Sequence, residues 1–195
     1  MQFYVNGVLA TEKYAKNIRF VTPGSFTVRA VDKLGNETTV SFSIIRERPT
    51  FTANVPSGTL TNQDVVLTAN KVCEFTTVDG EVLATGTSFT ISSHGVTDVR
   101  VFDLAGNYGG LYRANIDKKA PGLFAEVEGT NIPVANGAEI NKTVAIRTNE
   151  KAHFVINGSE PTALAYHVKI KAEGTYTIQA IDRIGNISRN VCGDL

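Results

Sequence analysis

Hydrophobic and polar residues alternate one by one along several short segments of this chain. In residues 175–180, for example, Tyr176, Ile178 and Ala180 are separated by threonine and glutamine. A period of two residues is typical of a β-strand that buries one face and exposes the other. We find no long segment with apolar residues at helical spacing, so the pattern predicts an all-β protein.

The segments between the expected strands carry turn residues that tolerate positive φ. Asparagine or aspartate followed by glycine lies between apolar segments, which is a signal for a tight β-hairpin. Several short strands joined in this way are typical of a β-sandwich. The three pairs are Asn6-Gly7, Asp79-Gly80 and Asn157-Gly158.

One pattern occurs three times along the chain, and it indicates a tandem array of similar units. Each copy has a glycine, an aspartate eight residues later, and a Gly-Asn pair that begins three residues after the aspartate. The repeated positions are Gly24, Asp32, Gly35 and Asn36 in the first copy, Gly95, Asp103, Gly106 and Asn107 in the second, and Gly174, Asp182, Gly185 and Asn186 in the third.

The similarity between the copies extends upstream of this pattern. Residues 64–75 align with residues 143–154, and nothing in the first copy corresponds to them. Proline, which ends a strand and stiffens a linker, marks the boundaries at Pro49 and Pro121. We therefore predict full repeats of about 70–75 residues, preceded by a partial one that lacks its first two strands. The predicted ranges are residues 1–47, 48–118 and 119–195.

Residues 173–180 read EGTYTIQA and resemble the F strand of immunoglobulin domains. Together with the D-x-x-G-N pattern and the D-x-x-A-P of residues 117–121, they resemble the bacterial immunoglobulin-like (Big-type) repeats of surface and phage proteins. The resemblance implies tandem immunoglobulin-like β-sandwiches, the first one incomplete. Val28, Val99 and Ile178 occupy the cysteine position of true immunoglobulin domains, so we expect no inter-sheet disulfide.

Charge and hydropathy exclude several classes of partner. The chain has 19 basic and 19 acidic residues without clusters, so it lacks the electrostatic footprint for nucleic acid. Its apolar runs are far shorter than the roughly 20 residues that cross a bilayer, and its first residues do not form a signal peptide. Cys73 and Cys192 fall in different repeats, so we expect free thiols and no disulfide within a repeat.

The sequence carries no motif of a common catalytic site, and we predict that the protein is not an enzyme. It has no G-x-S-x-G elbow, P-loop or H-E-x-x-H, and no ligand-like partner lies near His94, His153 or His167. We interpret the repeated aspartates as turn residues. A calcium carboxylate, with Asp117 of the linker, is the alternative, although no D-x-D-x-D-G loop is present. We therefore expect no cofactor.

Two kinds of surface site stay open at this point. Tyr108 and Tyr112, with Tyr14, are the candidate aromatic contacts for a glycan ligand, although the chain has no tryptophan. The N-x-S/T sequences fit turn geometry, and glycosylation is the alternative. Their asparagines are Asn36, Asn141, Asn157 and Asn186.

We predict a non-catalytic structural or adhesive spacer, or binding module, of a bacterial cell-surface or secreted protein. A bacteriophage virion component (decoration, tail or baseplate) and an accessory module of a polysaccharide-degrading enzyme are the alternatives. The expected partner is another protein or a second copy, or else a surface glycan, with no nucleic acid and no membrane insertion. The incomplete first repeat fits either a section of a longer protein or strands supplied by another subunit.

Overall fold

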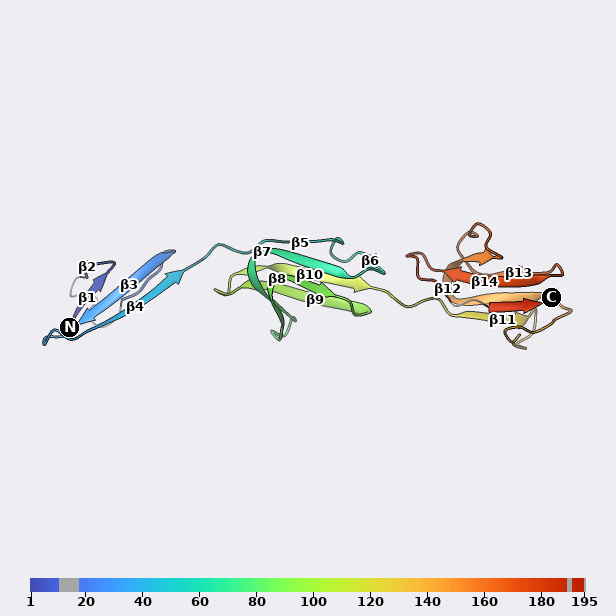
Figure 1. Cartoon of the computed structure of the whole chain (residues 1–195), viewed down its shortest axis with the longest axis horizontal. Helices are drawn as coiled ribbons and strands as arrows, with labels where there is room; N and C mark the ends of the chain where they lie inside the picture. The colour runs from blue at the N-terminus through green and yellow to red at the C-terminus, as the bar shows by residue number, and fades with distance from the viewer. Residues whose placement is uncertain (11–17, 189–190, 195) are drawn as a thin grey trace. The chain divides into compact units, whose positions relative to one another are not determined.

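The computed structural model describes residues 1–10, 18–188 and 191–194, with side chains through residue 188. Strands β1 to β15 and their connections make up these residues, and Figure 1 shows no helix among them. The all-β prediction is therefore confirmed. Within the same described residues, no helix is long and apolar enough to cross a membrane.

The N-terminal sheet is antiparallel and has the order β2-β1-β3-β4. Its first hairpin turns at Asn6 and Gly7, whose φ angles of 49° and 82° fit the predicted tight turn. The strands are β1 (Gln2–Val5), β2 (Val8–Leu9), β3 (Gly24–Val31) and β4 (Glu37–Ile44).

The middle sheet has the order β5-β7-β9-β10-β6, and β8 also pairs with β7. Strands β7 and β9 pair in antiparallel fashion, whereas the short β6 runs parallel to β10. The strands are β5 (Phe51–Ala53), β6 (Leu60–Thr61), β7 (Val65–Thr76), β8 (Val82–Ile91), β9 (Gly95–Asp103) and β10 (Tyr108–Ile116).

The C-terminal sheet folds over on itself through its longest strand. The first part of β12 pairs with β11 and β13, a register irregularity follows Arg147, and the last part pairs with β14. Apolar residues of the two parts then enclose one core, which makes this region a sandwich. The strands are β11 (Leu123–Val127), β12 (Val144–Ile156), β13 (Ala165–Ile170), β14 (Thr175–Ile181) and β15 (Val191–Asp194).

Contacts along the chain group its residues into two compact units that do not coincide with the repeats. The strands of each sheet fall within one predicted repeat range, but residues of the middle sheet belong to both units. The repeat boundaries therefore stay predictions. One unit comprises Met1–Thr52, Thr68–Phe89 and Val99–Leu111, and the other Ala53–Leu67, Thr90–Asp98 and Tyr112–Leu195.

Candidate functional site: the repeated aspartate loops

The repeated aspartate closes the same loop in all three copies. One carboxylate oxygen of Asp32, Asp103 or Asp182 accepts hydrogen bonds from the main-chain N–H groups two and four residues later, at 2.8 to 3.0 Å. The glycine of the Gly-Asn pair takes a φ between 81° and 93°, a conformation that favours glycine. The geometry is that of a side-chain-stabilised turn.

The asparagine that ends each loop does more in the second and third copies than in the first. Asn107 donates its amide N–H to the main-chain oxygen of Ile45 at 3.0 Å, and Asn186 donates to that of Asp117 at 2.9 Å. Both acceptors lie in the linker that precedes the copy. Among the described residues, Asn36 bonds to its own aspartate and to no linker. The loop therefore fastens the preceding linker wherever one is described.

A lysine completes the loop of the second copy. The ammonium of Lys71 lies 3.1 Å from the carboxylate of Asp103 and also donates to the main-chain oxygen of Glu47 at 2.7 Å. The Asp103 side chain is buried, and its pKa falls to about 2 because Asn107 hydrogen-bonds to the carboxylate and because Lys71 adds a positive charge. The second copy thus holds its buried carboxylate ionised with its own cation.

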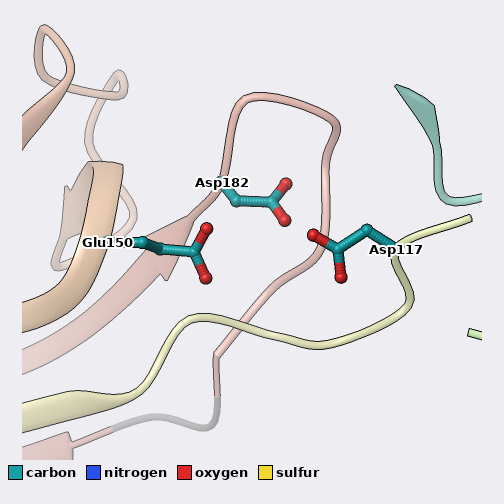
Figure 2. A group of neighbouring side chains, drawn as sticks. All are labelled: Asp117, Glu150 and Asp182. Carbon is teal, nitrogen blue, oxygen red and sulfur yellow. The ribbon is translucent and has the colours of Figure 1, made fainter. Parts of the chain in front are cut away.

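The third copy replaces that cation with a carboxylate. Glu150 stands at the position aligned with Lys71, and Asp117 stands where the preceding linker has Ile45. Figure 2 shows Asp117, Glu150 and Asp182 turned toward one another from the linker, from β12 and from the loop after β14. Carboxylate oxygens of the three residues lie within 4.8 Å of one another. The sequence analysis named Asp117 together with the repeated aspartates as a calcium alternative. It missed Glu150, although the alignment of Glu150 with Lys71 contained that signal.

The three carboxylates are the residues of the described chain that could hold a metal ion, and they supply part of a calcium site. Calcium takes six to eight oxygen ligands, and the cluster offers one oxygen from each of three side chains. Asp182 already accepts three hydrogen bonds from its loop. Asp117 accepts one from Lys119 and faces the imidazole of His94 at 3.4 Å. The arrangement concentrates negative charge without a complete shell of ligands.

The two candidate aromatic residues do not form a common platform. Tyr112 is 3% exposed and donates its hydroxyl hydrogen to the main-chain oxygen of Val55 at 2.6 Å. Tyr108 is 40% exposed, and its ring packs against Phe102 with centroids 5.2 Å apart. The predicted ligand contact therefore depends on Tyr108 alone and stays a prediction, and Tyr14 lies outside the described residues.

His153, His167 and Cys73 add no reactive group to these loops. His153 makes a local bond at 2.5 Å to the main-chain oxygen of Thr162, and His167 is exposed on β13. Cys73 is buried, and burial, with the negative charge of Asp103, raises the pKa of its thiol, which makes it a poor nucleophile. The side chain of Cys192 lies outside the described residues.

A hollow of about 1030 Å³ lies among the loops at one end of the C-terminal sandwich. Its lining carries lysine and glutamate side chains and no aromatic ring, so it offers no stacking surface for a sugar. The lining residues are Val127, Thr130, Ile132, Glu139, Ile140, Asn141, Lys142, Thr143, Lys171, Ala172 and Glu173.

Comparisons with known proteins add little to what this geometry shows. No family model matches the chain, and no curated protein matches it. Among solved structures, it is similar to the Bacteroides ovatus mixed-linkage glucan utilization locus protein SGBP-B in complex with a mixed-linkage heptasaccharide, at 13% identity and a TM-score of 0.27. The match covers 99% of this chain and 60% of that one, so the chain spans less than two thirds of the length of that protein. A likeness at this level supports no conclusion about function.

Proposed function

We propose that this chain is a non-catalytic spacer in a bacterial cell-surface or secreted protein, built from immunoglobulin-like repeats of the Big type. The observation that carries the proposal is that both described linkers are fastened to the sheet that follows them, by the same side chains in the same way. Catalysis or the binding of a small ligand does not require the same linker contacts at each junction, whereas a spacer must restrain its linkers at every junction.

Two asparagines hold each linker. Besides the loop residues Asn107 and Asn186, Asn70 accepts a hydrogen bond from the N–H of Thr50 at 2.9 Å. Its counterpart Asn149 accepts one from the N–H of Gly122 at 2.6 Å. Each such bond contributes about 0.5–1.5 kcal/mol, so two of them hold the linker backbone against thermal motion.

The linker prolines add close packing to these bonds. Pro49 and Pro121 are both buried, in contrast to the exposed residues that precede them. At Gly109, an added Cβ atom would lie 2.7 Å from the main-chain oxygen of Pro49, so glycine permits the approach. Proline also fixes its own φ, which removes a rotation from the linker. The linkers are thus short, stiff and attached, as a spacer requires.

Backbone ¹⁵N relaxation of the full chain tests the proposal. We expect residues 123–181 and residues 65–116 to share one rotational diffusion tensor, and the double variant Asn149→Ala/Asn186→Ala to separate them. Asn36→Ala is the matched control, because it removes the same loop asparagine where no linker is held. Independent tumbling of the two regions in the unaltered chain would refute the spacer role.

Location is the second part of the proposal and has its own test. Antibody raised against the chain should label intact cells of the source organism, and protease added outside those cells should remove the signal. Labelling that requires permeabilised cells would contradict a surface or secreted role.

A further inference from the structure

The four N-x-S/T sequences of the chain differ in what their asparagine side chains already bind. N-glycosylation joins the side-chain Nδ2 atom of such an asparagine to a sugar. On a folded chain, the nitrogen must first leave any hydrogen bond that it makes within the protein, and the transferase must reach it at the surface. The bonds of the four side chains therefore decide which asparagine the fold presents for modification.

Three of the four asparagine side chains are already held by hydrogen bonds. Asn36 donates from Nδ2 to the aspartate of its own loop at 2.9 Å. Asn157 donates from Nδ2 to the main-chain oxygen of Thr175 at 3.1 Å, and its Oδ1 accepts from the N–H of Thr177 at 2.7 Å. Asn186 donates to its own aspartate and to the preceding linker, at 2.8 and 2.9 Å. Transfer to any of these three would have to break bonds that hold a turn or a linker.

Asn141 is held by no such bond. It is exposed in the irregular segment between β11 and β12, and its side chain makes no hydrogen bond to any residue that the structure describes. The hydroxyl of Thr143, which completes this N-x-T sequence, makes none within the described chain either. By contrast, Ser188 completes the sequence of Asn186, and its buried hydroxyl accepts a bond from the N–H of Ala180 at 2.8 Å. Both polar groups of the motif are thus available at Asn141.

The surface beside Asn141 has room for a sugar. Asn141 and Thr143 line the hollow of about 1030 Å³ at the end of the C-terminal sandwich. The same lining contains Ile132, which is 60% exposed, and the exposed side chains of Lys171 and Glu173. A sugar presents both C–H groups and hydroxyls, which suit an apolar side chain and charged ones. A covalently attached sugar also does not need the aromatic stacking surface that this hollow lacks.

We propose that Asn141 is the N-glycosylation site of the folded chain. The second substrate is a sugar activated as a phosphate or diphosphate ester. Nδ2 of Asn141 forms a bond to C1 of the sugar, the bond from C1 to the phosphate oxygen breaks, and the phosphate leaves with the bonding electrons. One proton of Nδ2 passes to a base of the transferase. The inference goes beyond the spacer role and does not depend on it.

The probe for the test is UDP-glucose with a soluble N-glucosyltransferase that accepts N-x-S/T sequences. Transfer to each asparagine of the folded full chain is followed by peptide mass mapping, and each rate is divided by that of an isolated peptide of the same sequence. We expect this ratio at Asn141 to exceed that at Asn36 by about fivefold and those at Asn157 and Asn186 by about thirtyfold, because one and two hydrogen bonds must break there first. Equal ratios at the four sites, or no transfer to the folded chain, would overturn the proposal.

A matched pair of variants tests the motif at Asn141. Thr143→Val removes the hydroxyl with little change of shape, and Thr38→Val makes the same change in the N-x-T sequence of Asn36. We expect Thr143→Val to abolish transfer to Asn141 and Thr38→Val to leave it unchanged, with amide spectra to check both folds. Asn141→Gln should likewise remove the first sugar from the intact mass. Transfer to residue 141 that survives Thr143→Val would contradict the assignment.

The native protein gives the final test. In the chain isolated from its source organism, we expect an intact mass that exceeds the sequence mass by one glycan, and fragmentation that places the sugar on Asn141. A native chain without sugar at this residue would overturn the proposal. Antibody labelling of intact cells tests the surface location separately, so the two failures are distinguishable.

Discussion

Glu150→Lys should stabilise the C-terminal sandwich, because it rebuilds there the cation that the second copy already has. In the second copy an ammonium lies 3.1 Å from the buried carboxylate. In the third copy a carboxylate takes its place, and oxygens of Asp117, Glu150 and Asp182 lie within 4.8 Å of one another. The substitution removes two repulsive pairs and creates attractive ones.

The magnitude follows from these distances. Two like charges at this separation repel by about 1 kcal/mol in a medium close to water, and more where Asp182 is buried. Ion pairs at partly exposed positions gain about 0.2–1 kcal/mol. We therefore expect Glu150→Lys to raise the free energy of unfolding by about 2 kcal/mol, which for a domain of this size corresponds to about 10 °C in Tm.

The assay is urea unfolding in low salt with a chelator, followed through the amide signals of Phe154 and Ile178 so that the C-terminal sandwich is observed separately. Glu173→Lys is the control, because it makes the same charge change at an exposed position outside the cluster. High salt should reduce the gain of Glu150→Lys. If the two variants change stability equally, or if Glu150→Lys destabilises, the repulsion inferred from the geometry is wrong.

Three further predictions concern the second copy. Lys71→Met should destabilise it by about 1–2 kcal/mol in urea unfolding, because it leaves Asp103 without its cation, and an unchanged midpoint would contradict this. Because the folded-state pKa of Asp103 is lowered from 3.8 to about 2, its contribution to stability is complete above pH 3.8 and is lost as the pH falls toward 2. In an acid titration followed by circular dichroism, the stability of Asp103→Asn should fall less steeply between pH 3.8 and 2 than that of the unaltered chain. Identical slopes would refute the prediction. Gly109→Ala should cost about 1–3 kcal/mol in thermal unfolding, since its Cβ would meet the Pro49 oxygen at 2.7 Å, whereas Gly86→Ala, with its nearest atom at 3.8 Å, is the neutral control.

The elements of the fold were predictable because they depend on local rules. Alternation at Tyr176, Ile178 and Ala180 predicts β14, in which Ile178 and Ala180 are 3% and 0% exposed. The Asn157-Gly158 pair predicts its turn, with φ angles of 49° and 72°. Each signal needs only a few neighbouring residues, so a single sequence contains it.

It was harder to predict whether a given side chain lies on the buried or the exposed face of its strand, because burial depends on residues far away in sequence. Tyr112 was a candidate ligand contact, but it alternates with Ala114 and Ile116, which are each 1% exposed, and its hydroxyl bonds to Val55. The alternation was present in the sequence, but a tyrosine on a strand suits either face until the strand opposite it is known.

The second and third copies differ in charge at the loop that fastens the linker. At three aligned positions the second copy has Ile45, Lys71 and Asp103, with a formal charge of zero, and the third has three acids with a formal charge of −3. Backbone geometry is the same at both loops, so the fold does not require the difference. The two junctions therefore differ in charge although their loops share one backbone geometry, and we expect the three acids to cost stability at the second of them. The Glu150→Lys variant measures that cost directly, because it changes the charge and leaves the loop bonds of Asp182 in place.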